Sequence, residues 1–146
     1  MKNISFLFLA LICLVSISSC RKDSGEPDNQ NEKMIVGKNW KLTAYTEDGD
    51  DVFFELYDAC ERDNIETFFA DKTFKIDEGA TKCDPSDPQT SASGNWSISG
   101  NKLTLSAPGL SLQFVTTIIA LNSTTLKYSL INPFGGETLI FTYTAQ

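Results

Sequence analysis

The sequence predicts an all-β fold: an eight-stranded antiparallel up-and-down barrel with a short helix after the first strand. Apolar and polar side chains alternate along eight short segments, as they do in strands with one buried face. Turn-type sequences join nearly all of these segments, and no long crossover helix separates them, which disfavours a parallel sheet. A meander of this size usually closes into a barrel, because closure removes the exposed edges. An open curled sheet or a two-sheet sandwich is the alternative.

The individual elements follow from where apolar residues recur along the chain. In the first strand, Trp40, Leu42 and Ala44 share one face. Apolar residues then recur at helical spacing, so a short helix is expected over about 51–60. Residues 79–92 are rich in Gly, Pro, Asp, Ser and Thr and are expected to form a long loop. The eight expected strands are residues 37–45, 65–69, 73–77, 95–98, 102–105, 110–121, 124–131 and 137–144.

Composition excludes several classes of function. The 146 residues include no histidine, which excludes a Ser-His-Asp triad, a Cys-His dyad and a HExxH zinc site. The chain has 12 basic and 19 acidic residues, a net charge of -7 and no basic stripe, so nucleic-acid binding is not expected. The acidic residues 48–55 depart from the spacing of a calcium-binding loop, and no metal site or cofactor is predicted. Glu66 and Glu137 are candidate acid–base groups, but nothing in the sequence brings them together, and we expect no enzymatic activity.

The first nineteen residues have the organisation of a secretory signal peptide. A charged start is followed by an apolar run that is too short for a comfortable transmembrane helix. The run ends in Ile17-Ser18-Ser19-Cys20, which resembles a bacterial lipobox. That resemblance implies cleavage before Cys20, a diacylglyceryl thioether on its sulfur and acylation, for example by palmitate, of the new amine. An ordinary signal peptide with Cys20 as a spare thiol is the alternative.

Residues 20–33 are expected to be the lipidated cysteine followed by a flexible tether, because residues 21–33 contain no aromatic or aliphatic side chain. The charged residues directly after Cys20 resemble the export signals of surface lipoproteins in some Gram-negative bacteria. The expected partner is therefore a lipid bilayer, and the expected location is the outer membrane, on its periplasmic side or at the cell surface. Residues 34–146 are expected to form the barrel domain.

The remaining cysteines predict a disulfide bond. Cys13 lies in the signal peptide and Cys20 is the lipidation site, so Cys60 and Cys83 remain as a pair in an exported domain. A redox or metal role is disfavoured because there is no CxxC motif and no histidine. The bond would tie the expected helix to the loop 79–92, beside one mouth of the barrel.

Three motifs carry a resemblance to a known family. They are Gly37-Lys38-Asn39-Trp40 at the start of the first strand, the hairpin from Phe69 to Phe74, and the strand Gly94-Asn95-Trp96-Ser97-Ile98. Together with the helix after the first strand, they resemble the lipocalin-like domains of small lipoproteins in Gram-negative bacteria, over about residues 35–146. The resemblance implies a barrel that binds small molecules rather than an enzyme.

The alternation also predicts which side chains point inward. Seven inward aromatics are candidates for contact with a small apolar ligand: Trp40, Phe74, Trp96, Phe114, Tyr128, Phe141 and Tyr143. Four of them, Trp40, Trp96, Tyr128 and Tyr143, are expected around the open mouth. The leading hypothesis is a membrane-anchored binding module for a small apolar or amphipathic molecule. The alternative is a filled barrel that acts as a structural or protein-interaction lipoprotein, since eight strands enclose a space that large side chains can fill.

Overall fold

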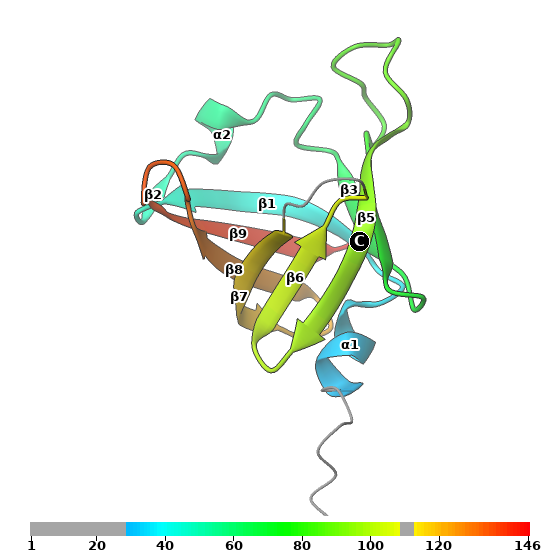
Figure 1. Ribbon diagram of the computed structural model, residues 1–146. Coiled ribbons are helices and arrows are strands. Elements are labelled where there is room, and N and C mark those ends of the chain that lie inside the picture. Colours follow the sequence, from blue (N-terminus) through cyan, green and yellow to red (C-terminus); the bar gives the residue numbers. More distant parts are fainter. Residues whose placement is uncertain (1–28, 109–112) are drawn as a thin grey trace, which may run out of the picture.

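A closed antiparallel sheet forms the molecule in the computed structural model, which describes residues 29–108 and 113–146 (Figure 1). The predicted signal peptide and Cys20 lie outside these residues. The strands are β1 (Asn39–Glu47), β2 (Asp50–Asp51), β3 (Ile65–Phe68), β4 (Thr73–Asp77), β5 (Thr90–Ser99), β6 (Lys102–Ser106), β7 (Gln113–Leu121), β8 (Thr125–Ile131) and β9 (Thr138–Ala145). The helices are α1 (Asn29–Ile35) and α2 (Phe53–Leu56).

Pairing between the first and last long strands closes the barrel. β1 pairs with β3 on one side and with β9 on the other, while β2 pairs antiparallel only with Thr46 and Glu47 at the end of β1. The remaining neighbours pair in chain order, from β3 to β9. The predicted eight-stranded up-and-down barrel is therefore confirmed, with the two-residue β2 as an addition.

The tight turns have local causes in the sequence. In the β3–β4 hairpin, the Asp71 carboxylate accepts hydrogen bonds from the backbone N–H of Thr73, at 3.0 Å, and from its hydroxyl, at 2.6 Å. In the β7–β8 turn, the side-chain oxygen of Asn122 accepts the backbone N–H groups of Thr124 and Thr125, both at 2.9 Å. Side chains that bond their own backbone two or three residues on stabilise such turns, so these links stay short.

The largest differences in length from the expectation are in helix α2 and strand β5. Helix α2 ends at Leu56 rather than near residue 60, because Tyr57 is extended and the following residues turn toward the Cys60 disulfide. Strand β5 begins at Thr90, inside the expected loop 79–92. Residues 90–93 are exposed and, apart from Ala92, polar, but their backbone pairs with β4, so strand structure here depends on a neighbour and not on alternation.

A β-bulge in β1 changes which side chains point inward. The register shifts between Leu42 and Ala44, opposite β9. Trp40 and Leu42 point inward as expected, but after the bulge the buried residue is Tyr45 and not Ala44. One extra residue in a strand reverses the alternation that follows it. The expectation that Ala44 shares the inner face of Trp40 is therefore wrong.

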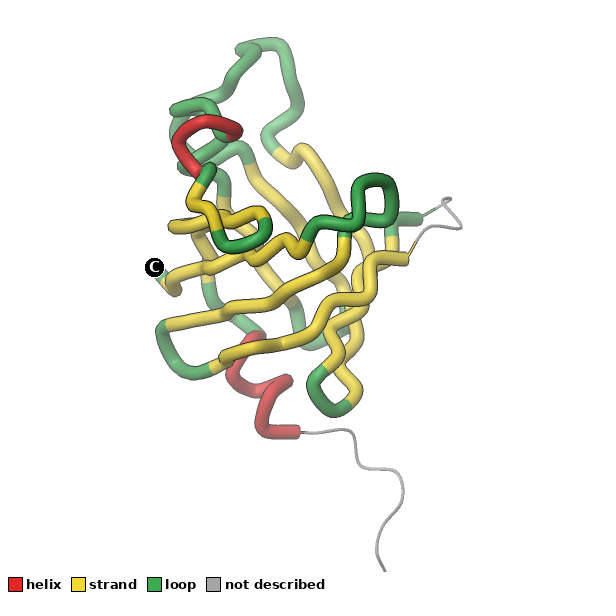
Figure 2. Tube along the Cα trace, turned by 90° about the vertical axis from the view of Figure 1, so that its left-hand side faces the viewer, coloured by secondary structure: helices red, strands yellow, loops and turns green. Residues whose placement is uncertain are grey.

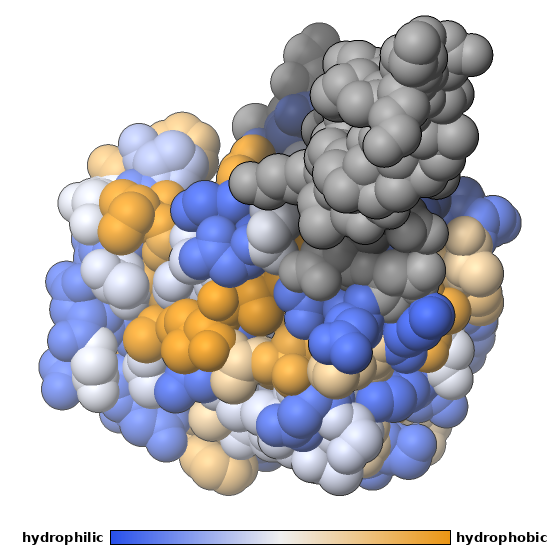
Figure 3. All heavy atoms as spheres, turned by 90° about the horizontal axis from the view of Figure 1, so that it is seen from below, coloured by the Kyte–Doolittle hydropathy of each residue, from blue (hydrophilic) through white to orange (hydrophobic). Residues whose placement is uncertain are grey.

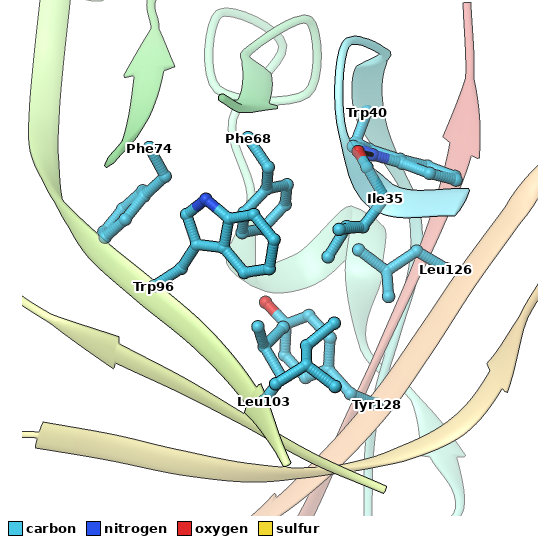
Figure 4. Close-up of a cluster of buried hydrophobic side chains, with 9 residues drawn as sticks. Ile35, Trp40, Phe68, Phe74, Trp96, Leu103, Leu126 and Tyr128 are labelled. Atoms are coloured by element: carbon cyan, nitrogen blue, oxygen red, sulfur yellow. Dashed lines mark hydrogen bonds between the residues drawn. The ribbon is translucent and has the colours of Figure 1, made fainter. Parts of the chain in front are cut away.

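One end of the barrel is closed by packed side chains (Figure 4). Ile35, Trp40, Phe68, Leu103 and Leu126 are fully buried there. The indole N–H of Trp40 donates to the carbonyl of Ile35 at 2.9 Å, so the tryptophan is fixed against the end of α1. Seen from this end, the visible surface mixes hydrophilic and hydrophobic residues over the filled core (Figure 3).

Helix α1 extends the folded domain toward the N-terminus. It begins at Asn29, within the segment 20–33 that was expected to be a tether. Its last residue, Ile35, is fully buried in the core at the closed end, and its Glu32 forms a salt bridge with Lys72 in the β3–β4 turn. The helix is thus held by contacts made at residues 32 and 35, which the polar composition of its first turn did not reveal.

Candidate functional site

The longer loops gather at the opposite end of the barrel (Figure 2). The interior is hollow at this end. Two cavities lie there, and Phe141 of β9 lines both. The first, which we call the acidic cavity, has a volume of about 520 Å³ and is lined by Leu42, Tyr57, Glu61, Asn64, Glu66, Ile76, Glu78, Cys83, Asp87, Ser91, Phe141 and Tyr143. The second, which we call the apolar cavity, has a volume of about 330 Å³ and is lined by Leu105, Phe114, Thr116, Tyr128, Leu130, Asn132, Pro133, Phe134, Leu139 and Phe141.

A third and larger hollow, of about 730 Å³, is formed on the outer side of the sheet. Its strand residues include Lys41, Thr67 and Lys75, which alternate with the inward residues of β1, β3 and β4. Because its lining comes from the outer face, we do not treat it as part of the barrel interior.

The predicted disulfide builds one wall of the acidic cavity. Cys60 and Cys83 are bonded, with their Cα atoms 5.2 Å apart, which confirms the pairing. The carbonyls of Cys60 and Glu78 determine the orientation of the Asn64 amide. In that orientation its nitrogen donates to both carbonyls, at 3.2 and 3.1 Å. These bonds hold the segment after α2 against the start of the loop that follows β4.

The Asp63 carboxylate fixes the same two segments a second time. It accepts the backbone N–H groups of Ala80 and Thr81, at 3.1 and 2.9 Å, and the Thr81 hydroxyl at 2.9 Å. Gly79 makes this approach possible: its φ is +68°, and a Cβ there would lie 2.2 Å from the carbonyl oxygen of Asp63. The wall of the cavity is therefore cross-linked both covalently and by hydrogen bonds.

A buried carboxylate lies inside the barrel. Glu66 is only 3% exposed and lies in β3, two residues before the buried Phe68, so both side chains share the inner face. Burial raises the pKa of Glu66 to about 7, although a hydrogen bond from the Tyr143 hydroxyl opposes the rise. The Tyr143 and Tyr128 hydroxyl oxygens are in turn 3.0 Å apart. Glu66 and the two tyrosines thus form a polar chain across the interior.

Burial also governs the titration of these tyrosines. Desolvation raises the pKa of Tyr128 and of Tyr143 well above the ordinary value, and the nearby Glu66 charge raises both further. Both hydroxyls are therefore neutral over the physiological range and can donate hydrogen bonds. Tyr57, at the entrance, also has a raised pKa, caused first by burial and then by the charges of Glu61 and Glu47.

The apolar cavity opens widely to solvent. Phe134 is 97% exposed, and Phe114 is 46% exposed although it lies on the inner face of β7. Deeper in the cavity, the Thr116 hydroxyl is satisfied by the carbonyl of Leu103, at 3.0 Å. No lysine, arginine, aspartate or glutamate is among the described residues that line it, so its chemistry is hydrophobic.

The structure divides the seven predicted ligand-contact residues between the two ends. Trp40, Phe74 and Trp96 belong to the closed-end core and line neither cavity. The expectation that Trp40 and Trp96 rim the open mouth is therefore wrong. The remaining four residues line a cavity: Phe114, Tyr128 and Phe141 the apolar one, and Phe141 and Tyr143 the acidic one. That any of them binds a ligand stays a prediction.

Sequence reasoning missed the polar lining of the acidic cavity. The sequence offers Glu66 only as a candidate acid–base partner of Glu137, and Glu137 instead accepts a hydrogen bond from Asn132 at 2.9 Å in the β8–β9 loop. The alternation of the strand could have indicated this orientation. Glu66 lies two residues before the inward-facing Phe68, so its side chain must point to the same inner face, where an apolar residue is usual. Glu78, also buried, follows β4 at a position where no pattern indicates its orientation.

Two acidic residues near β2 accept hydrogen bonds from backbone N–H groups. The Asp48 carboxylate accepts the N–H of Thr138 at 2.7 Å, and that of Asp51 accepts the N–H of Phe53 at 3.1 Å, at the start of α2. Within residues 29–108 and 113–146, no group of three or more His, Cys, Asp or Glu is arranged to hold a metal ion. Nor is any helix of this part of the chain long and apolar enough to span a bilayer.

Comparison with known proteins identifies the domain. The family model described as a lipocalin-like domain matches residues 35–128, from the end of α1 to the middle of β8. It covers more than half of the chain, although β9, which closes the barrel and supplies Phe141 and Tyr143, lies beyond it. No curated protein matches the sequence. On the family model and the closed barrel together, the chain belongs to the lipocalin-like domain family.

Proposed function

We propose that the protein is a lipid-anchored, non-enzymatic binding module for a small apolar or amphipathic molecule. The observation that carries this proposal is the pair of cavities at one end of a barrel whose other end is filled. Their volumes, about 520 and 330 Å³, are those of small-molecule sites. The apolar walls would gain affinity from area removed from water, while the few polar groups would orient the ligand.

Calorimetry on the protein beginning at Arg21 tests this binding function, because that form keeps every described residue and lacks the lipid. Fatty acids, retinoid-like compounds and haem-like compounds are suitable first probes. Saturable binding of at least one of them is expected. Calorimetry is preferable to tryptophan fluorescence, since Trp40 and Trp96 lie in the closed-end core, away from both cavities. A flat response to every probe would contradict the binding function.

The anchor is proposed at Cys20, in the outer membrane of a Gram-negative cell. Two or more acyl chains would hold the domain stably, at about 0.8 kcal/mol for each buried CH₂. Helix α1 lies at the closed end of the barrel (Figure 1), and an extended chain from Cys20 to Asn29 spans at most about 30 Å. An anchor at Cys20 would therefore keep the closed end near the bilayer and leave the cavities free to turn away from it.

The variant Cys20→Ser tests the anchor. It should leave the precursor uncleaved or release the mature domain into the aqueous phase on detergent partitioning, while Cys13→Ser, in the discarded segment, should behave like the unmodified protein. A cleaved mature domain that still partitions with the membrane in Cys20→Ser would contradict lipidation at this site.

An interaction lipoprotein is the second candidate, favoured by apolar side chains exposed around the open end. Phe54 and Leu56 on α2, Ile131 at the end of β8 and Phe134 in the next loop are all exposed. Apolar residues gathered on one end of a domain can mark a protein contact. A flat ligand response combined with self-association or partner capture lost in Phe134→Ser would favour this function.

A further inference from the structure

We propose that the acidic cavity binds the ammonium group of an amphipathic ligand, whose apolar part lies along Phe141 toward the apolar cavity. The inference rests on the proposed binding function and adds the chemical class of the ligand: an organic cation with an alkyl or aryl portion. It follows from the charge of the cavity, the burial of its carboxylates and the aromatic faces beside them.

The charge of the acidic cavity is entirely negative among its described lining residues. Four carboxylates line it, those of Glu61, Glu66, Glu78 and Asp87, and neither lysine nor arginine does. The salt bridges within the described ranges, Lys72–Glu32 and Lys75–Asp77, involve none of these four residues. A buried carboxylate is costly unless it is paired, and a cationic ligand would supply the missing partner.

Two basic residues, Arg62 and Lys82, are chain neighbours of the lining residues Glu61 and Cys83, and both donate to backbone carbonyls. Arg62 donates to the carbonyl of Tyr57 at 3.0 Å, and its guanidinium lies over the ring of Phe54, 4.9 Å from the centroid. Lys82 donates to the backbone carbonyl of Asp87 at 2.6 Å, so its positive charge lies beside Asp87, an exposed residue of the lining. Glu66 and Glu78, the two buried carboxylates, are therefore the groups left for a ligand.

The lining favours an organic cation over a metal ion. The described carboxylates form no cluster that could coordinate a metal. The aromatic side chains of Tyr57, Phe141 and Tyr143 line the same cavity as Glu66. A carboxylate together with aromatic rings suits an alkylammonium group, because the faces of aromatic rings attract organic cations. A metal ion would instead need several carboxylate or carbonyl oxygens around it. Burial raises the pKa of Glu66 to about 7. A bound cation beside the carboxylate would lower that pKa and favour the ionised form.

The neighbouring cavity accounts for the apolar part of the ligand. Phe141 lines both cavities, and the hydrogen-bonded pair of Tyr128 and Tyr143 has one ring in each lining. A molecule with its ammonium group near Glu66 can therefore extend its chain past Phe141 toward Leu105 and Leu139, where no charged residue is present among the described lining.

Three ligands of equal chain length test the proposal by calorimetry: octylammonium, octanol and octanoate, at neutral pH. Octylammonium should bind at least about tenfold more tightly than octanoate, with octanol between them. Glu66→Gln should weaken octylammonium binding by about tenfold or more and change octanol binding by less than about twofold. Glu55→Gln is the matched control, since Glu55 is exposed on α2 outside the cavity lining and should leave all three affinities unchanged.

The outcomes separate this inference from the function on which it rests. Octanol or octanoate that binds as tightly as octylammonium would overturn the cation preference and leave the binding function intact. An equal loss in Glu66→Gln and Glu55→Gln would overturn the assignment to the cavity. If none of the three ligands binds while a fatty acid, retinoid-like or haem-like probe does, the cation inference fails and the binding function stands; if those probes are silent as well, both proposals fail. If Glu66→Gln does not fold, Glu78→Gln provides the same comparison from the other buried carboxylate.

Discussion

The two ends of the barrel bury different kinds of side chain. At the closed end, Trp40, Phe68 and Leu126 are fully buried in one apolar cluster, and helix α1 adds Ile35. At the open end, Glu66 and two tyrosines share the interior with apolar side chains, and both cavities lie there. The difference shows how a small barrel can separate stability from binding: one end supplies the packed core, and the other retains space and buried charge that cost stability.

The largest expected effect is the stability difference between two aromatic truncations. Trp40→Ala removes a fully buried side chain from the closed end and should lower the free energy of unfolding by about 3–5 kcal/mol. Phe114→Ala removes a ring that is 46% exposed at the open end and should cost about 1 kcal/mol or less. Urea unfolding of both variants measures the difference. Equal losses of stability in the two variants would contradict the difference between a packed closed end and a hollow open end. Leu126→Ala can replace Trp40→Ala if that variant does not fold.

That contrast also shows what the sequence could predict. Alternation with a period of two gave the strands and the barrel, because every strand must bury one face. It also placed Phe114 and Trp40 on the inner face alike, and only the structure distinguishes a filled end from an open one. Position along the barrel axis depends on the pairing of strands far apart in the chain, such as Trp40 with Ala145.

Other features escaped prediction because a neighbour determines them. The bulge in β1 depends on its register with β9, and it brings Tyr45 rather than Ala44 inward. Helix α1 depends on the space that Ile35 fills and on a partner, Lys72, from a distant hairpin. The Cys60–Cys83 bond, in contrast, was predictable from counting cysteines, because only these two lie within the predicted barrel domain, residues 34–146.

Loss of the disulfide should affect the open end selectively. Replacing Cys60 and Cys83 by alanine removes a crosslink across 23 positions and should lower the free energy of unfolding by about 3 kcal/mol. Amide hydrogen exchange should accelerate most around residues 57–64 and 78–90. In β6, exchange should change only as much as the loss of global stability requires. Uniform acceleration throughout the barrel would show that the two ends do not behave as separate regions.

The buried carboxylate should give stability an unusual pH dependence. The pKa of Glu66 is about 7 in the folded protein against 4.5 for an ordinary glutamate, so its protonated form is favoured by folding. Its contribution is complete below about pH 4.5 and is lost as the pH rises through 7, a fall of roughly 2–3 kcal/mol in the free energy of unfolding. Glu66→Gln should abolish this fall in urea unfolding measured between pH 4.5 and 8.

Three other carboxyl groups act in a different pH range. The pKa values of Asp71, Asp77 and Asp84 are lowered, chiefly by hydrogen bonds from Thr73, Lys75 and Ser86. Their stabilising effect is present above their ordinary value of 3.8 and is lost as the pH falls through the lowered values. Stability that is constant between pH 4.5 and 8 in the unmodified protein would therefore contradict the buried state of Glu66.

The smallest expected effect isolates the tyrosine next to Glu66. Tyr143→Phe removes the hydroxyl that donates to Glu66 and contacts the Tyr128 hydroxyl at 3.0 Å, and it should cost about 1 kcal/mol in stability. Because that hydroxyl favours the ionised carboxylate, its loss should move the pH-dependent fall in stability to a higher pH. Tyr45→Phe is the control: its hydroxyl donates to Glu47 at 2.8 Å, so it loses a similar bond without touching Glu66. A shifted pH profile in both variants, or in neither, would show that Tyr143 does not set the titration of the buried carboxylate, and that the polar chain at the open end is not coupled as its geometry indicates.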